Sequence, residues 1–129
     1  MQQDYTLYPV RAAAILTGSY VAGTVLSPFN GNPALRNQLN LLIDLTIGSL
    51  TSAEVKIEWS HDGVTYFQDT FESIAAGTST LSLGNYTIAS TGTYTLSLPI
   101  KFSYIRVSAK GTGTVTSSSM TINAIIGTV

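Results

Sequence analysis

The residues best suited to chemistry lie in one short stretch beside Trp59, the single tryptophan of the chain. His61, the single histidine, precedes Asp62, and such a pair could act as a base or bind a metal ion. A zinc site needs several histidine, cysteine or carboxylate ligands, but the chain has no second histidine and no cysteine. We therefore predict that His61 is a turn residue, and we expect no metal site and no cofactor.

Three carboxylates, Glu58, Asp69 and Glu72, are close enough in sequence for two of them to face each other across a hairpin, as in glycoside hydrolases. Catalytic carboxylates need a cleft and a raised pKa in one of them, whereas solvated charges on a strand are commoner. The segment also lacks the alternating oxygen ligands of a calcium loop. No nucleophile elbow, phosphate loop or dinucleotide glycine pattern occurs. We expect no enzyme, and a hydrolase is the lowest-ranked hypothesis.

Arg106 allows two interpretations. With Tyr104 and Lys101 nearby in sequence, it could belong to a ligand-facing patch, or it could pair with a carboxylate on a neighbouring strand. We favour the cross-strand pair.

Length and charge limit the classes of function. With 129 residues the chain is expected to form one domain, 1–129. Six Lys and Arg against seven Asp and Glu leave no electrostatic basis for binding nucleic acid or an anionic membrane. Charged residues make up 10% of the chain, which protects poorly against association, so we expect partners to cover much of the surface. The apolar run 12–16 is too short for a membrane span or a secretory signal, which favours synthesis in the host cytoplasm.

The element that must position these residues is a hairpin whose first strand alternates apolar and polar residues over 55–60. Asp62 and Gly63 mark its turn. A three-residue loop, 61–63, with Gly63 in a left-handed conformation, would place Phe67 on the apolar face and bury both phenylalanines of the returning strand. A two-residue loop would instead place Tyr66 beside the tryptophan. We prefer the first register.

Seven further segments show the two-residue period of strands or are short enough between turns to be strands. They are 10–16, 20–26, 39–47, 78–83, 93–98, 102–109 and 120–126. We place turns at 48–53 and 110–113 and a bend at 117–119. Seven or eight short strands without a convincing helix predict an all-β, antiparallel β-sandwich of the jelly-roll or immunoglobulin-like kind.

Two further segments are candidates for contacts with partners. The apolar N-terminal arm, about residues 1–9, could pair along a sheet edge or lie on a neighbouring subunit. The loop 28–33 is a cluster of turn residues in a long connection, and such connections are commonly functional. The candidate interface comprises Tyr5, Leu7, Tyr8, Pro28, Phe29, Asn30, Pro33, Tyr104 and Arg106.

Two motifs together resemble small all-β virion proteins of tailed bacteriophages: VKIEWSHDGVTY at 55–66 and FSYIRVSAKGTG at 102–113. The resemblance covers about the second half of the chain. It implies a capsid decoration or auxiliary protein, or a head-tail accessory, located in the virion. Such a protein would bind the major capsid protein or other virion proteins, and itself, as a homo-oligomer or symmetric array.

A similar hairpin also occurs in discoidin-like and other carbohydrate-binding sandwiches. The alternative hypothesis is therefore a carbohydrate-binding module, in which exposed Trp59, Tyr66 or Tyr104 would stack on sugar rings. A buried Trp59 would favour the structural hypothesis instead.

Overall fold

The computed structural model of the chain describes residues 7–27 and 38–127, and within these ranges it contains strands and loops but no helix. No described segment therefore offers a helix long and apolar enough to cross a membrane. The strands are β1 (Leu7–Ala14), β2 (Val21–Ala22), β3 (Gln38–Thr46), β4 (Leu50–Ser60), β5 (Phe67–Gln68), β6 (Thr70–Ala75), β7 (Thr78–Leu83), β8 (Asn85–Ile88), β9 (Gly92–Pro99), β10 (Tyr104–Gly113) and β11 (Ser119–Gly127). The predicted all-β class is confirmed.

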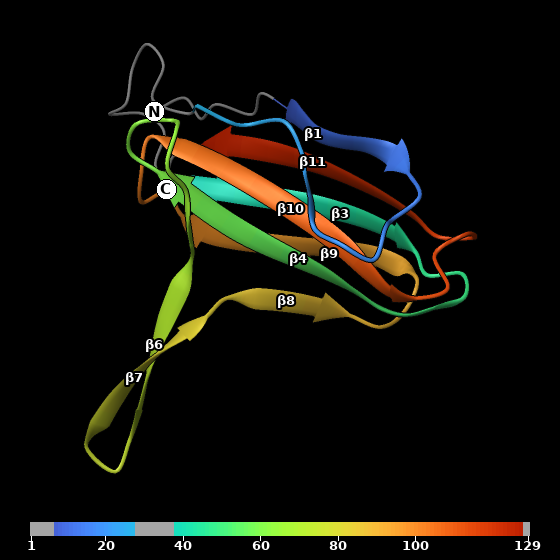
Figure 1. Cartoon of the computed structure of the whole chain (residues 1–129). Coiled ribbons are helices and arrows are strands. Elements are labelled where there is room, and N and C mark those ends of the chain that lie inside the picture. Colours follow the sequence, from blue (N-terminus) through green and yellow to red (C-terminus); the bar gives the residue numbers. More distant parts are fainter. Residues whose placement is uncertain (1–6, 28–37, 128–129) are drawn as a thin grey trace.

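Two antiparallel sheets form the body of the molecule (Figure 1). Sheet A has the order β1-β11-β3-β9, and sheet B has the order β2-β10-β4-β5, with β8 also pairing with β4. The hairpin β6–β7 belongs to neither sheet and projects away from them (Figure 1). The predicted antiparallel β-sandwich is confirmed. The described residues form eleven strands rather than the expected seven or eight, and the number includes very short strands such as β2 and β5.

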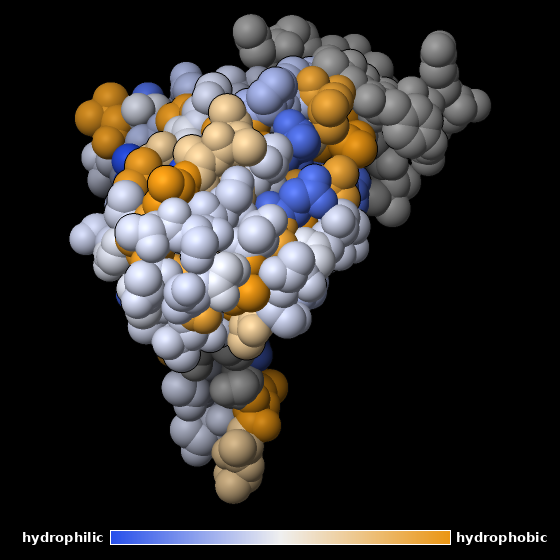
Figure 2. All heavy atoms as spheres, turned by 90° about the vertical axis from the view of Figure 1, so that its right-hand side faces the viewer, coloured by the Kyte–Doolittle hydropathy of each residue, from blue (hydrophilic) through white to orange (hydrophobic). Residues whose placement is uncertain are grey.

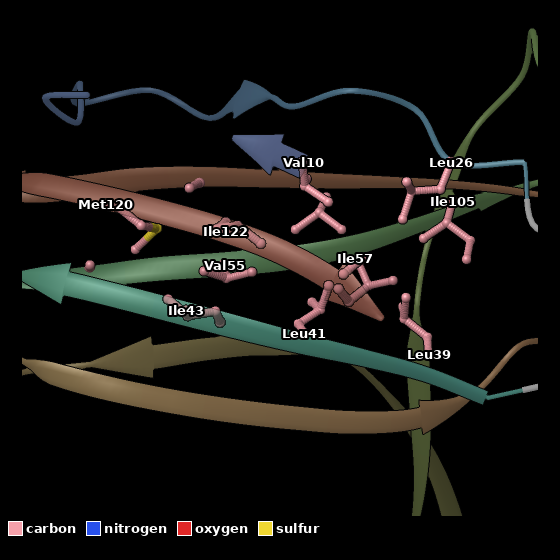
Figure 3. Close-up of a cluster of buried hydrophobic side chains, with 14 of the residues drawn as sticks. Val10, Leu26, Leu39, Leu41, Ile43, Val55, Ile57, Ile105, Met120 and Ile122 are labelled. Atoms are coloured by element: carbon pink, nitrogen blue, oxygen red, sulfur yellow. The ribbon is translucent and has the colours of Figure 1, made fainter. Parts of the chain in front are cut away.

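The core lies between the inner faces of the two sheets (Figure 3). On β3, Leu39, Leu41, Ile43 and Leu45 occupy every second position and are buried, as their period of two requires. They face the buried apolar rows of sheet B, which contain Ala53, Val55, Ile57 and Trp59 on β4 and Ile105, Val107 and Ala109 on β10. The predicted inward rows of all three strands are therefore confirmed.

The turn predicted at 110–113 is wrong. β10 continues through Gly113 and pairs with β4 along its whole length, down to Gly113 opposite Leu50. A Cβ on Gly111 would lie 2.7 Å from Cδ2 of Leu50 and 3.2 Å from Cβ of Leu16. Gly111 is thus required for close packing inside a strand, whereas the sequence pattern suggested that it formed a turn.

The turn predicted at 48–53 is shorter than expected. It is confined to Gly48 and Ser49, and β4 begins at Leu50. Gly48 has a φ of 55°, and a Cβ there would lie 2.4 Å from the carbonyl oxygen of Ser117. A left-handed glycine packed against another backbone reverses the chain within two residues, and this leaves 50–53 free to extend the strand.

The loop after β4 is longer than the predicted three residues, because Phe67 pairs with Trp59 and 60–66 lies between them. Gly63 has the predicted left-handed conformation, with φ of 78°. The register differs by two residues from the predicted one, so Phe67 keeps the predicted face. It is nevertheless 40% exposed and lies edge-on to Phe102, with 4.8 Å between the ring centroids, so its predicted burial is wrong.

Residues 7–9 of the predicted N-terminal arm belong to β1, which pairs with β11 at the edge of sheet A. Tyr8 packs against the core, whereas Leu7 is exposed. Pairing along a sheet edge was one of the two arrangements predicted for the arm. Residues 1–6 lie outside the described part of the chain.

Candidate interaction surfaces

Trp59 is a core residue, with 1% of its surface exposed. Its indole Nε1 donates a hydrogen bond to Oδ1 of Asp69 at 2.8 Å, and Nζ of Lys101 lies 2.8 Å from the same oxygen. The buried carboxylate thus satisfies the indole N–H and is neutralised by a lysine. The predicted burial of Trp59 is confirmed, and the ring is not accessible as a platform for a sugar.

Asp69 also fixes the base of the projecting hairpin through its backbone. Its N–H donates to the carbonyl oxygen of Ile57 at 2.8 Å, and its own carbonyl oxygen accepts from the N–H of Gly84 at 2.9 Å. Asp69 directly precedes β6 and Gly84 directly follows β7. One residue therefore ties both ends of the hairpin to the strand that carries the tryptophan.

Arg106 forms the cross-strand pair that the sequence favoured. It lies opposite Glu58, its Nη2 is 3.0 Å from Oε2, and its Nε donates to Oε1 at 3.2 Å. Its guanidinium also stacks on the ring of Tyr66, 4.0 Å from the centroid. The two hydrogen bonds form the bidentate pair typical of arginine and carboxylate. The edge of the guanidinium thus binds Glu58 and its face lies on Tyr66.

Two of the three carboxylates considered for catalysis have separate structural partners. Glu58 holds Arg106, Asp69 holds Trp59 and Lys101, and Glu72 is exposed on β6. Among the described residues, no three His, Asp or Glu side chains form a group that could hold a metal ion. Glu58 and Asp69 thus stabilise packing, whereas Glu72 has no partner in the described part of the chain.

His61 and Asp62 lie in the exposed loop after β4. Oδ1 of Asp62 accepts hydrogen bonds from the N–H of Thr65 at 2.9 Å and of Val64 at 2.8 Å, and from Oγ of Ser60 at 2.9 Å. These hydrogen bonds, from Thr65 first, lower the pKa of Asp62 to about 2. The motif Ser-His-Asp-Gly is thus explained by local folding of the loop.

The hairpin β6–β7 has one apolar face. Its register pairs Thr70 with Leu83, Glu72 with Leu81 and Ile74 with Ser79. Directly opposed residues, and every second residue along a strand, share a face, so all six side chains point to the same side. Ile74, Leu81 and Leu83 are 69%, 72% and 61% exposed. Figure 2 shows apolar atoms along one side of the projecting hairpin.

The outer face of sheet A is polar but almost uncharged. Its side chains come from β3, β9 and β11: Asn40, Leu42, Asp44, Thr46, Thr93, Thr95, Ser97, Ser119, Thr121, Asn123 and Ile125. Two shallow hollows lie on this face, of about 280 Å³ beside Asp44 and Thr93 and about 270 Å³ beside Asn40 and Leu42. Oγ1 of Thr93 donates to Oδ1 of Asp44 at 2.6 Å, so the one carboxylate among the residues named here has a hydroxyl partner.

The described part of the predicted interface does not come from one element. Leu7 and Tyr8 lie on β1 at the edge of sheet A, whereas Tyr104 and Arg106 lie on β10 in sheet B. Tyr104 is half-buried and its ring packs over Gly63, where a Cβ would lie 3.2 Å from it. The remaining candidates, Tyr5, Pro28, Phe29, Asn30 and Pro33, lie outside the described residues, and their role stays a prediction.

Comparison with known proteins places the fold and leaves the family open. No family model matches the chain, and no curated protein matches it. Among solved structures, it is similar to the PBSX exported protein XepA, a phage-related protein, with a TM-score of 0.67 and 8% sequence identity. The match covers 96% of this chain and 37% of XepA, so the chain spans little more than a third of that protein. At this identity the likeness shows a common fold.

Proposed function

We propose that the chain is a non-enzymatic structural protein of a phage virion, a capsid decoration or auxiliary protein that binds the major capsid protein and itself. The observation that carries the proposal is the projecting hairpin with its exposed apolar face. An exposed cluster of large apolar side chains of this kind is typical of sites where proteins bind one another. Exposing these apolar side chains to water does not stabilise a monomer.

The low charge of the chain supports the same function. With 10% charged residues and a net charge of -1, long-range repulsion between copies is weak. The almost uncharged outer face of sheet A adds hydroxyl and amide groups that can hydrogen-bond to a protein partner without a large cost of desolvating charges. Both features suit a subunit surrounded by others in a dense array.

The structural role of the polar groups supports a function without catalysis. The carboxylate of Glu58 is paired with Arg106. The carboxylate of Asp69 binds the indole of Trp59 and the ammonium group of Lys101. Catalytic groups commonly keep one functional atom open towards a cleft.

The phage assignment is supported by two independent likenesses. The motifs at 55–66 and 102–113 resemble virion proteins of tailed phages, and the fold is similar to that of XepA. Location in the virion, after synthesis in the host cytoplasm, follows from this assignment.

The alternative of a carbohydrate-binding module receives less support. Trp59 is buried, and Tyr66 is covered on one face by Arg106. Sugar platforms need an open aromatic face. Among the aromatic residues proposed for stacking, only Tyr104 remains, and it is half-buried over Gly63.

The test is to purify phage particles from a lysate in which the chain is made and to measure its copy number per major capsid protein by quantitative mass spectrometry. We expect a fixed ratio that matches the capsid symmetry. Particles that lack the chain would overturn the proposal. A glycan array probed with the same purified chain tests the alternative, for which binding lost on Tyr104→Ala would be the supporting result.

A further inference from the structure

The apolar face of hairpin β6–β7 carries one charge that has no partner among the described residues. Glu72 lies opposite Leu81 in the middle of this face. Every other described acidic residue has a partner. Glu54 pairs with Lys110, Glu58 with Arg106 and Asp69 with Lys101. Asp44 and Asp62 accept hydrogen bonds from nearby groups. The hairpin thus presents a carboxylate framed by Ile74, Leu81 and Leu83.

The opposite side of the sandwich carries a complementary feature. Arg11 on β1 meets no carboxylate in the described part of the chain, and its Nη2 donates to the carbonyl oxygens of Ala14 and Ile15 at 3.1 and 3.0 Å. Ile15 is exposed, and so are Ala12 and Ala13 between it and Arg11. A cation without an acidic partner therefore lies within an apolar stretch, as the carboxylate does on the hairpin.

The two features lie on opposite sides of the molecule. β1 and β2 are the outermost strands of their sheets on one side, whereas β9, β5 and β8 are outermost on the other. In Figure 1 the hairpin extends from the side of β8 and β9, away from β1. A chain cannot fold its own hairpin back onto its own β1, so the two surfaces can meet only between copies.

We propose that the apolar face of hairpin β6–β7 of one copy docks on the β1 side of the next copy, with Glu72 paired to Arg11. The contact rests on the self-association in the proposed function and names its two surfaces. The surfaces differ, so the contact is heterologous and builds a closed ring or an open filament. Docking also stabilises the hairpin, because an isolated two-stranded ribbon is marginally stable in water.

The first test uses the absence of cysteine from the chain. The full-length variants Ser79→Cys, on the apolar face opposite Ile74, and Ala13→Cys are each treated with a short bis-maleimide cross-linker, alone and mixed. We expect cross-linked dimers in the mixture and monomers in each variant alone. Monomers in the mixture would overturn the proposal, and so would dimers of Ser79→Cys alone, because they would show a symmetric contact between hairpins.

The second test measures the affinity of self-association by sedimentation velocity. Leu81→Ser is expected to weaken it by about tenfold or more, as loss of a buried anchor does. The matched control is Thr80→Ser, the adjacent residue on the other face of the hairpin, which is expected to leave the affinity unchanged. Equal effects of the two substitutions would contradict the proposal.

The charge pair is tested by exchange. Glu72→Arg is expected to weaken self-association by about tenfold, and the double variant Glu72→Arg with Arg11→Glu to restore most of it. The melting temperature of each variant reports whether it folds, and the cross-linking test remains decisive if Arg11→Glu does not. A chain that self-associates through these residues but is absent from particles would refute the virion function and leave the contact intact.

Discussion

Strand β3 and strand β7 have the same kind of sequence and opposite surroundings. Both alternate leucine or isoleucine with polar residues. The inward row of β3, Leu39, Leu41, Ile43 and Leu45, is at most 3% exposed, whereas Leu81 and Leu83 of β7 are 72% and 61% exposed. β3 lies between two strands and under a second sheet, whereas β7 has one partner strand and no covering sheet within residues 7–27 and 38–127. Alternation therefore predicts that a strand has an apolar face, but what covers that face depends on the rest of the fold or on another molecule.

The largest expected effect is that of Trp59→Ala. It removes the largest buried side chain and leaves the carboxylate of Asp69 without the indole N–H. We expect the free energy of unfolding to fall by about 3 to 5 kcal/mol, measured by denaturant titration. An unchanged stability would show that the tryptophan is not part of the core.

Leu41→Ala and Leu81→Ala compare the two regions with one chemical change. In the core of the sandwich, Leu41→Ala is expected to cost about 2 to 5 kcal/mol because it leaves a cavity. On the hairpin of the isolated chain, Leu81→Ala is expected to change stability by about 0.5 kcal/mol or less. Comparable losses would mean that the hairpin is covered in the monomer.

Arg106→Ala is expected to cost about 1 to 3 kcal/mol, because it leaves the nearly buried carboxylate of Glu58 without its partner. The control is Lys110→Ala, which breaks the more exposed pair with Glu54 and should cost about 1 kcal/mol or less. A double-mutant cycle with Glu58→Ala measures the coupling in the first pair. Equal costs for the two single substitutions would contradict the distinction.

The smallest effect is expected from the titration of Asp62. Its folded pKa is lowered to about 2, so the carboxylate stabilises the loop at any pH above its unfolded value, and this contribution is lost as the pH falls through about 2. NMR titration of the Asp62 carboxyl should give a midpoint near that value, with the Val64 and Thr65 amide signals moving in parallel. A midpoint near the ordinary value of 3.8 would show that the loop hydrogen bonds do not form in solution.

The sequence predicted those features that depend on neighbouring positions along a strand. The inward rows of β3, β4 and β10 follow from the period of two, and the pair of Arg106 with a carboxylate follows from the need to neutralise a charge on a strand. Gly63 was correctly predicted as a left-handed turn residue because Asp-Gly has few other uses between strands.

The features that were missed depend on contacts between distant residues or on side chains that fold the loop. Asp69 recruits Lys101, 32 positions away, and no local pattern indicates this pair. The side chain of Asp62 binds two successive N–H groups and thereby lengthens the loop beyond the turn that Asp-Gly alone would make. The sequence pattern predicted a turn at Gly111, because the sequence does not show that Leu50 and Leu16 pack against this position.

The position of β11 has a consequence for how the molecule is made. β11 is the last described strand, yet in sheet A it lies between β1, the first, and β3. During synthesis β3 can pair with β9 on one edge, but its other edge and β1 stay unpaired until β11 has left the ribosome. Pairing between strands so far apart in sequence also carries a high loop-closure entropy, which places folding in the slow range of milliseconds to seconds. The nascent chain is consequently prone to aggregation while it lacks β11.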